Sequence, residues 1–292
     1  MTVTGTGAQA PASHRRVIST NGVELAAWIT GSGPTVVLVH GSLDDHRVWD
    51  RIVPRLAGTH RVVTYDRRGH GESTCPPGQG RIGEDVDDLA GLIEALGGDR
   101  PLVVGHSYGS STTLLLGAHH PELSSGLLVH EPPLFTLLAD DPATRALTEE
   151  AAEHMRRAAA LITGGDVAAG VQRFVDNAAF GPGTWDGLFT PEIRRTCLDN
   201  ADTWLDQSRD PDRLAVRPEL LAGYPNPIVI SHGSASLPTY APVATIVADT
   251  LPRARRHVVQ GAGHAPHLSH PADFAELIVD TVSVVHGPSR GR

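Results

Sequence analysis

Short apolar runs recur along the first part of the chain and return near its end. Most lack the apolar–polar alternation of a half-exposed strand, and a continuous run of this kind is typical of a strand buried on both faces of a parallel sheet. The runs that predict β-strands cover residues 23–30, 35–39, 61–65, 102–104, 126–130, 227–230 and 257–259.

Helical patterns separate these predicted strands. Apolar residues recur at three- and four-residue steps from Ile82 to Leu96, which predicts an amphipathic helix. A second helix is expected shortly after the strand at 102–104, and a last one over 271–286. Strands that alternate with helices indicate an α/β fold, with a mostly parallel twisted sheet flanked by helices.

The alternation stops after the strand at 126–130. The following segment reads as helices broken by glycine and proline, and it is rich in phenylalanine and tryptophan. We interpret it as a helical cap inserted into the α/β core. The predicted division is a core over 15–131 and 223–286, a cap over 132–222, and flexible tails over 1–14 and 287–292.

Composition limits the possible partners. The 292-residue chain has a formal net charge of −9, which argues against nucleic acids and anionic membrane surfaces because those partners select basic patches. Two cysteines, Cys75 and Cys197, suggest free thiols in a reducing compartment rather than a disulfide framework. The first residues lack the apolar stretch of a secretory leader, and no apolar run approaches the length of a membrane span. We therefore expect a cytoplasmic protein, whose oligomeric state no pattern predicts.

Residues 105–109 read Gly-His-Ser-Tyr-Gly between a predicted strand and a predicted helix. This context favours a nucleophile elbow, a sharp turn that exposes the hydroxyl of Ser107 and requires small neighbours. The alternative is an ordinary glycine-rich turn. If the elbow is present, the backbone N–H of Tyr108 is one donor of an oxyanion hole.

Four motifs together resemble the α/β-hydrolase superfamily. They are His40-Gly41 after a strand, the turn at 65–73, the elbow at 105–109, and Gly-Ala-Gly-His at 261–264. The resemblance covers nearly the whole chain outside the predicted cap. It implies the α/β-hydrolase fold, and it implies that the backbone N–H of Ser42 is the second oxyanion donor. We interpret the turn at 65–73 as structural, with Asp66 bonding within its own loop.

A neutral serine hydroxyl is a poor nucleophile, so Ser107 needs a base within hydrogen-bond reach. His264 is the candidate, since the order serine, acid, histidine fits this superfamily. Activity is then expected to rise with pH as His264 loses its proton. His267 and His270 follow at three-residue steps. Without acidic or cysteine partners we interpret them as part of a helix start rather than a metal site, and we expect no metal and no cofactor.

The acidic member of the triad departs from the usual pattern. The superfamily usually carries an aspartate three residues after the glycine that ends the strand following the cap, and Ser236 stands there in this chain. Glu131, at the end of the strand before the cap, is the predicted acid, placed to orient the histidine ring and stabilise its charged form. The alternative is a buried Glu131 paired with Arg67 or with a cap arginine, which would leave a Ser–His dyad.

The type of nucleophile narrows the reaction. Superfamily members that act on halides and epoxides use aspartate at the elbow, so Ser107 predicts acyl-enzyme chemistry on an ester or lactone. The Ser-Glu-His set and the segment 263–271 resemble those of zearalenone-type lactone hydrolases, which implies that the chain opens lactone rings. Three alternatives remain on the same fold: a carbon–carbon bond hydrolase, a cofactor-free perhydrolase, and a non-catalytic, receptor-like ligand-binding protein.

The predicted cap should determine specificity. An aromatic-rich lid over an apolar pocket suits a hydrophobic, uncharged small molecule. For each candidate the alternative is ordinary packing inside the cap. The residues expected to line the pocket are Leu134, Phe135, Leu138, Trp185 and Phe189.

Overall fold

The computed structural model describes residues 12–214 and 216–286. In this part of the chain, eight strands form one sheet with the order β1-β2-β4-β3-β5-β6-β7-β8. β1 and β2 pair antiparallel, as do β2 and β4, and the remaining pairs are parallel. The predicted α/β fold is confirmed. The strands are β1 (Ser13–Thr20), β2 (Val23–Thr30), β3 (Thr35–Val39), β4 (Arg61–Tyr65), β5 (Leu102–His106), β6 (Gly126–His130), β7 (Ile228–Gly233) and β8 (Ala254–Val259).

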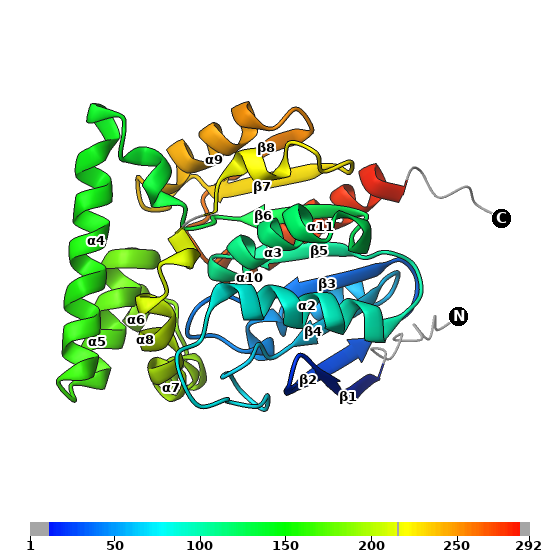
Figure 1. Cartoon of the computed structure of the whole chain (residues 1–292), viewed down its shortest axis with the longest axis horizontal. Helices are drawn as coiled ribbons and strands as arrows, with labels where there is room; N and C mark the ends of the chain where they lie inside the picture. The colour runs from blue at the N-terminus through cyan, green and yellow to red at the C-terminus, as the bar shows by residue number, and fades with distance from the viewer. Residues whose placement is uncertain (1–11, 215, 287–292) are drawn as a thin grey trace, which may run out of the picture.

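Helices cover both faces of the sheet (Figure 1). Successive side chains of a strand point to opposite faces. Val37 and Val39 therefore join the apolar cluster that contains α2, α3 and α9, whereas Val36 and Leu38 join the cluster that contains α1 and α11. This two-sided burial explains the continuous apolar runs. The core helices are α1 (Val53–Leu56), α2 (Ile82–Leu96), α3 (Tyr108–His119), α9 (Tyr240–Thr250), α10 (Pro266–Ser269) and α11 (Pro271–His286).

The prediction of a flexible segment over 1–14 is wrong for its last two residues, because β1 begins at Ser13. Residues 1–11 of that segment and the predicted tail over 287–292 lie outside the described residues. β1 pairs with β2 from Ser13 opposite Thr30 to Thr20 opposite Val23. Its residues are mostly polar and exposed, so it carries no apolar run. The signal that could have found it is Asn21-Gly22, a turn in which both residues have positive φ, +42° and +76°, as a tight hairpin requires.

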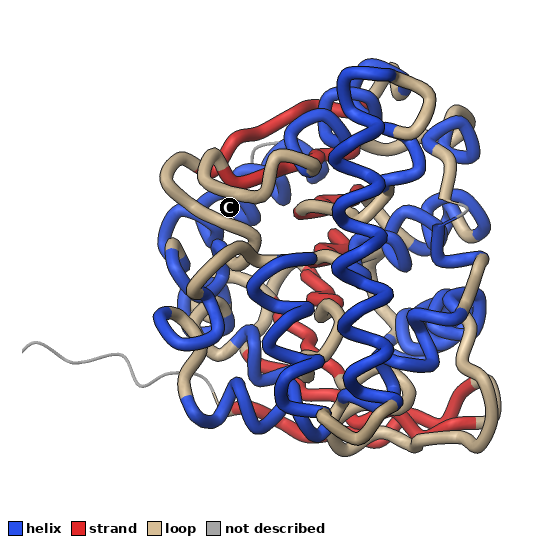
Figure 2. The backbone as a smooth tube through the Cα atoms, turned by 90° about the vertical axis from the view of Figure 1, so that its left-hand side faces the viewer, coloured by secondary structure: helices blue, strands red, loops and turns tan. Residues whose placement is uncertain are grey.

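Every described regular element between β6 and β7 is helical. The longest, α4, begins at Pro142, after Asp141 accepts a hydrogen bond from the Ala143 N–H. Figures 1 and 2 show α4 and its neighbours across one end of the sheet. The α-helices and the π-helical turn of this helical insertion are α4 (Pro142–Thr163), α5 (Val167–Arg173), the π-helical turn (Phe174–Ala179), α6 (Thr184–Gly187), α7 (Pro191–Asp199) and α8 (Ala201–Arg209). Within the described ranges, no helix combines the length and apolar character needed to cross a membrane.

Candidate active site

Ser107 occupies the sharp turn between β5 and α3. Its φ of +54° lies in the left-handed region that non-glycine residues rarely adopt. A Cβ on Gly109 would lie 2.5 Å from the carbonyl oxygens of Val39 and His40, and a Cβ on Gly105 would lie 2.5 Å from the Gly109 carbonyl oxygen. The glycines of the motif are therefore needed for close backbone approach, as an elbow requires.

Glu131 and His264 form a buried pair. Nδ1 of His264 lies 2.5 Å from Oε2 of Glu131, and the Gly233 N–H donates to Oε1 of the same carboxylate at 2.7 Å. Each of the two residues is about 1% exposed. Arg67, the alternative partner considered for this carboxylate, pairs instead with Asp85.

The backbone brings this pair to the elbow. Glu131 follows β6 directly, and its own φ of +51° is also left-handed. The Ser107 N–H donates to the His130 carbonyl oxygen at 2.9 Å, which fixes the elbow to the end of β6. Ser236 lies near the same carboxylate, and contributes to its charge state. Adjacent parallel strands therefore hold the serine and the glutamate at one end of the sheet.

The charge of Glu131 is stabilised despite its burial. Burial alone would raise the pKa of the carboxyl, but nearby His130, the hydrogen bond from His264 and the Ser236 hydroxyl outweigh that effect and hold its pKa below the ordinary value. An ionised Glu131 can accept a hydrogen bond from the Nδ1–H of His264, which leaves Nε2 as the basic nitrogen.

Aromatic rings fix the orientation of His264. Its ring stacks on Tyr240 with centroids 4.6 Å apart, and meets the edge of Phe180 at 4.7 Å. His106 packs on it at 4.6 Å and places Nε2 2.8 Å from the His264 carbonyl oxygen. Nε2 of His264 is buried and has no hydrogen-bond partner among the described residues. The nitrogen expected to act as the base is therefore available for a reacting group.

The loop after β3 lies against the elbow. A Cβ on Gly41 would come within 3.2 Å of the Ser107 Cβ. Arg67 donates to the carbonyl oxygens of His40 and Gly41, at 3.2 and 2.9 Å. Because a trans peptide directs its C=O and the following N–H to opposite sides, Arg67 fixes the direction of the Ser42 N–H.

The same network reaches the other expected donor. Nη1 of Arg67 lies 3.0 Å from Asp85, whose second oxygen accepts from the Tyr108 hydroxyl at 3.0 Å. The guanidinium carbon also lies 4.6 Å from the centre of the Tyr108 ring. The two residues expected to form the oxyanion hole are thus tied to one buried arginine.

Ser42, Ser107 and Tyr108 open onto a cavity of about 510 Å³. Of the five pocket residues predicted from the sequence, Phe135 lines this cavity. The other four are buried in apolar clusters and do not line it: Leu134, Leu138, Trp185 and Phe189. The lining residues are Ser42, Ser107, Tyr108, Pro133, Phe135, Thr136, Thr148, Ala151, Ala152, Met155, Arg156, Ala159, Phe174, Ala178, Ala179, Trp204, Ser208, Arg209, Arg213 and Tyr240.

Most residues of the cavity wall could not be predicted from the sequence. Phe174, Ala178 and Ala179 come from the π-helical turn, a rare geometry that is often found at functional sites. The alanines of α4 supply small side chains that leave room for a ligand. No local pattern separates such residues from helix packing, because their orientation depends on how the helical insertion sits on the core.

A second buried acid lies beside the elbow. Oδ2 of Asp44 is 3.9 Å from Nδ1 of His106, and neither atom has a hydrogen-bond partner among the described residues. Burial, together with the negative charge of Asp45, raises the pKa of Asp44 to about 8. Asp44 is therefore protonated in the folded protein at neutral pH.

Replacing Asp44 with asparagine is expected to flatten the pH dependence of stability. Between about pH 4 and 8 the folded state holds a proton on Asp44 that the unfolded state has lost, so the free energy of unfolding falls by about 1.4 kcal/mol per pH unit from this group. Urea unfolding at pH 5 and 7.5 measures the slope in both proteins. The exposed control Asp140→Asn should retain the parent slope, and equal slopes in the parent and Asp44→Asn would contradict the prediction.

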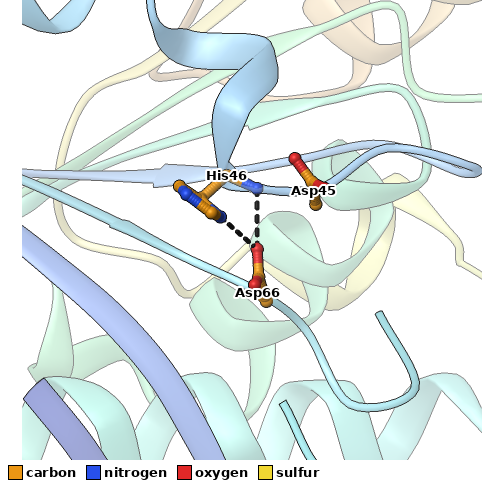
Figure 3. Close-up of side chains that lie close together, drawn as sticks. All are labelled: Asp45, His46 and Asp66. Carbon is orange, nitrogen blue, oxygen red and sulfur yellow. Dashed lines mark hydrogen bonds and ion pairs between the residues drawn. The ribbon is translucent and has the colours of Figure 1, made fainter. Parts of the chain in front are cut away.

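One group of side chains has the spacing of metal ligands. Oxygen and nitrogen atoms of Asp45, His46 and Asp66 lie within 4.8 Å of one another (Figure 3). Their atoms already have partners, however. Asp66 accepts from the backbone N–H groups of His46 and Glu72, and Asp45 is paired with Arg47. These contacts hold the loops together, which agrees with the interpretation that the turn containing Asp66 is structural.

His267 and His270 do not join a metal-binding group among the described residues. His267 is buried in α10, and α11 begins at Pro271 directly after His270. His267 instead packs against Trp49 and His106, with ring centroids 5.1 and 4.5 Å apart.

The chain is similar in sequence to known proteins. The model of a family described as the alpha/beta hydrolase family matches residues 36–277. Among curated proteins, the chain is 42% identical over 101 residues to the probable oxidoreductase EphD of Mycobacterium tuberculosis (strain ATCC 25618 / H37Rv). That match covers 33% of this chain and 17% of EphD, so the chain spans about a sixth of that relative's length.

Solved structures match over much more of the chain. A thermophilic esterase from Thermogutta terrifontis, with malate bound, is 26% identical with a TM-score of 0.74, covering 94% of this chain and 99% of the esterase. Est816, described as an N-acyl homoserine lactone degrading enzyme, is 23% identical with a TM-score of 0.72, covering 91% and 99%. At that identity the likeness to Est816 concerns the fold alone.

Proposed function

The chain belongs to the alpha/beta hydrolase family, and we propose that it is a serine hydrolase that cleaves esters or lactones of small molecules through an acyl-enzyme on Ser107. The observation that carries the proposal is the combination of a strained Ser107, open to a cavity, with the buried Glu131–His264 hydrogen bond. A strained elbow and a histidine held by a carboxylate are the parts that activate a serine.

In the proposed reaction, Nε2 of His264 takes the hydroxyl proton as Oγ of Ser107 attacks the carbonyl carbon. The backbone N–H groups of Ser42 and Tyr108 stabilise the negative oxygen. The C–O bond to the leaving alcohol breaks, and the alcohol takes the proton from His264. Water then attacks the acyl-enzyme with His264 again as the base, which releases the acid and restores Ser107.

Serine at the elbow separates this proposal from epoxide chemistry, which needs a carboxylate nucleophile. The finer proposal of a lactonase rests on the resemblance of Glu131, Ser236 and the segment 263–271 to zearalenone-type enzymes. Ring opening of a lactone uses the same steps as ester cleavage, except that the alcohol remains attached to the acyl group. A carbon–carbon hydrolase, a perhydrolase or a non-catalytic binder would keep the same residues, so measurement must separate them.

The proposal is tested with p-nitrophenyl esters of short and medium chain length beside aliphatic, aromatic and macrocyclic lactones. A fluorophosphonate is expected to label Ser107, found by peptide mapping, and turnover should fall in proportion to the labelled fraction. Turnover of lactones well above simple esters would support the lactonase. Full activity after complete labelling of Ser107 would reject the serine mechanism. If no ester or lactone is turned over, turnover of a diketone in a second assay, or tight binding of a lactone without turnover, would favour the alternatives.

A further inference from the structure

Positive charge gathers in the cavity without matching negative charge. Three arginines, Arg156, Arg209 and Arg213, are among the residues that line it, and no aspartate or glutamate of the described chain is. Most other lining groups are apolar or hydroxyl-bearing. The aromatic-rich cap predicted a pocket for an uncharged molecule, and these arginines change that expectation.

Two of the three arginines have partners outside the cavity. Nη2 of Arg156 lies 2.8 Å from Glu153, and Nη1 of Arg209 lies 3.5 Å from Asp206. Both arginine side chains are more than half exposed, so water also solvates them. Neither requires a ligand to satisfy its charge.

Arg213 differs from both. It makes no ion pair with any described residue, and its Nε is buried without a hydrogen-bond partner. The nearby acid, Asp210, is occupied by backbone groups, because its oxygens accept from the N–H groups of Asp212 and Ile82. Burial accordingly lowers the pKa of Arg213, although a guanidinium in a protein remains charged.

Arg213 is half-buried, and a cation that loses part of its water without gaining a partner destabilises the folded protein. Such a group is retained at a binding site when the ligand supplies the missing charge and hydrogen bonds. A guanidinium offers a planar set of donors that matches the two oxygens of a carboxylate. Arg213 therefore has the chemistry of a receptor for a carboxylate.

The position of Arg213 relates it to the reacting centre. It shares the cavity with Ser107 and Tyr108, and the Tyr108 side chain is near enough to act on its charge. The Tyr108 hydroxyl does not neutralise Arg213, because it donates its proton to Asp85. A ligand whose carbonyl meets Ser107 can therefore place another group against Arg213 inside the same cavity.

We propose that Arg213 binds a carboxylate of the substrate, so that the enzyme prefers esters or lactones that carry a free carboxylate over neutral ones of the same length. This inference rests on the proposed serine hydrolysis at Ser107. It adds one recognition group to an otherwise largely apolar cavity. The carboxylate replaces the water that the guanidinium loses on burial, and the intervening chain packs against apolar side chains such as Phe135 and Phe174.

The test compares p-nitrophenyl hydrogen adipate with p-nitrophenyl hexanoate, two esters that differ by the distant carboxylate. Arg213→Gln is expected to lower kcat/KM for the adipate ester by about 10- to 100-fold, the range expected for a hydrogen bond to a charged group. The value for the hexanoate ester should change less than threefold. Arg213→Lys should retain part of the preference for the adipate ester, because lysine keeps the positive charge but lacks the planar guanidinium.

Arg157→Gln is the matched control, since Arg157 is an exposed arginine of α4 that pairs with Glu153 and does not line the cavity. It should leave the ratio of the two kcat/KM values unchanged. If folded Arg213→Gln keeps the parent ratio, the carboxylate site is rejected while the serine mechanism stands. If Ser107→Ala hydrolyses both esters as fast as the parent, the proposed function is rejected.

Direct binding tests the site independently of turnover. Calorimetric titration of Ser107→Ala with monomethyl adipate and with methyl hexanoate should show tighter binding of the adipate ester. The additional Arg213→Gln substitution should remove that difference. Equal binding of the two esters to Ser107→Ala would overturn the inference. A thermal unfolding curve shows whether the double variant is folded. If it is not folded, Arg213→Lys in the Ser107→Ala background replaces it in the same titration.

Discussion

Replacing Ser107 with alanine is expected to lower kcat for any ester or lactone substrate by about 10⁴-fold or more, with a melting temperature close to that of the parent. The acyl-enzyme requires Oγ, and no alternative path through water benefits from His264 to the same degree. The variant should still bind substrate, since the cavity and the oxyanion loop keep their geometry. Steady-state kinetics and thermal unfolding of purified protein check both parts.

Ser111→Ala provides a matched control for this prediction. Ser111 is buried in α3, four residues beyond Ser107, and its hydroxyl has no hydrogen-bond partner in the described chain. Removal of that hydroxyl should leave kcat within about twofold and should not reduce stability, because no bond is lost. Parent-like turnover by Ser107→Ala would exclude Ser107 as the nucleophile.

Replacing Glu131 with glutamine is expected to lower kcat by about 10³- to 10⁴-fold with little change in substrate binding. An amide can still accept from the Gly233 N–H, so the backbone at the end of β6 is preserved. The neutral side chain, however, no longer stabilises the positive charge that His264 gains in the transition state. It also permits the ring tautomer with the proton on Nε2, which cannot act as a base towards Ser107.

The comparison with Ser236→Ala isolates the role of Glu131. Ser236 stands where the superfamily usually carries its aspartate, and its hydroxyl lies near the same carboxylate. Because a hydroxyl cannot supply the missing negative charge, Ser236→Ala should lower kcat by less than about threefold. The kinetic constants of both variants, measured with one substrate, decide the ranking. If Ser236→Ala loses more activity than Glu131→Gln, the carboxylate is not the third member of the triad.

The sequence indicated the parts of this molecule that depend on local pattern. Strands buried on both faces have continuous apolar sequences, and the elbow requires glycine at 105 and 109. Both features are therefore visible in the sequence. The pairing of Glu131 with His264 was expected from the resemblance to the superfamily, whose fold can carry the acid at the end of the strand before the cap. The structure has a hydrogen bond between the two side chains. The roles proposed for these residues remain predictions.

The cavity could not be derived in the same way. Leu134 and Trp185 are as apolar as Phe135, yet only Phe135 faces the ligand space. The difference depends on how helices from 135 to 221 pack on the core, a long-range property. The unpaired Arg213 and the protonated Asp44 are equally invisible in the sequence, since each is defined by the partners that it lacks. β1 was not predicted, because an exposed edge strand carries no apolar run.

Glu131 lies at the boundary between β6 and the helical insertion, and this position affects how the specificity of such an enzyme can change during evolution. Glu131 ends the first part of the core, and most residues that wall the cavity follow it, between β6 and β7. In the usual pattern of the superfamily, the acid instead comes after the insertion. Here the insertion can be exchanged as one module whose first residue comes after the acid. Most of the cavity wall, Arg213 included, can therefore change without any change to Ser107, Glu131 or His264.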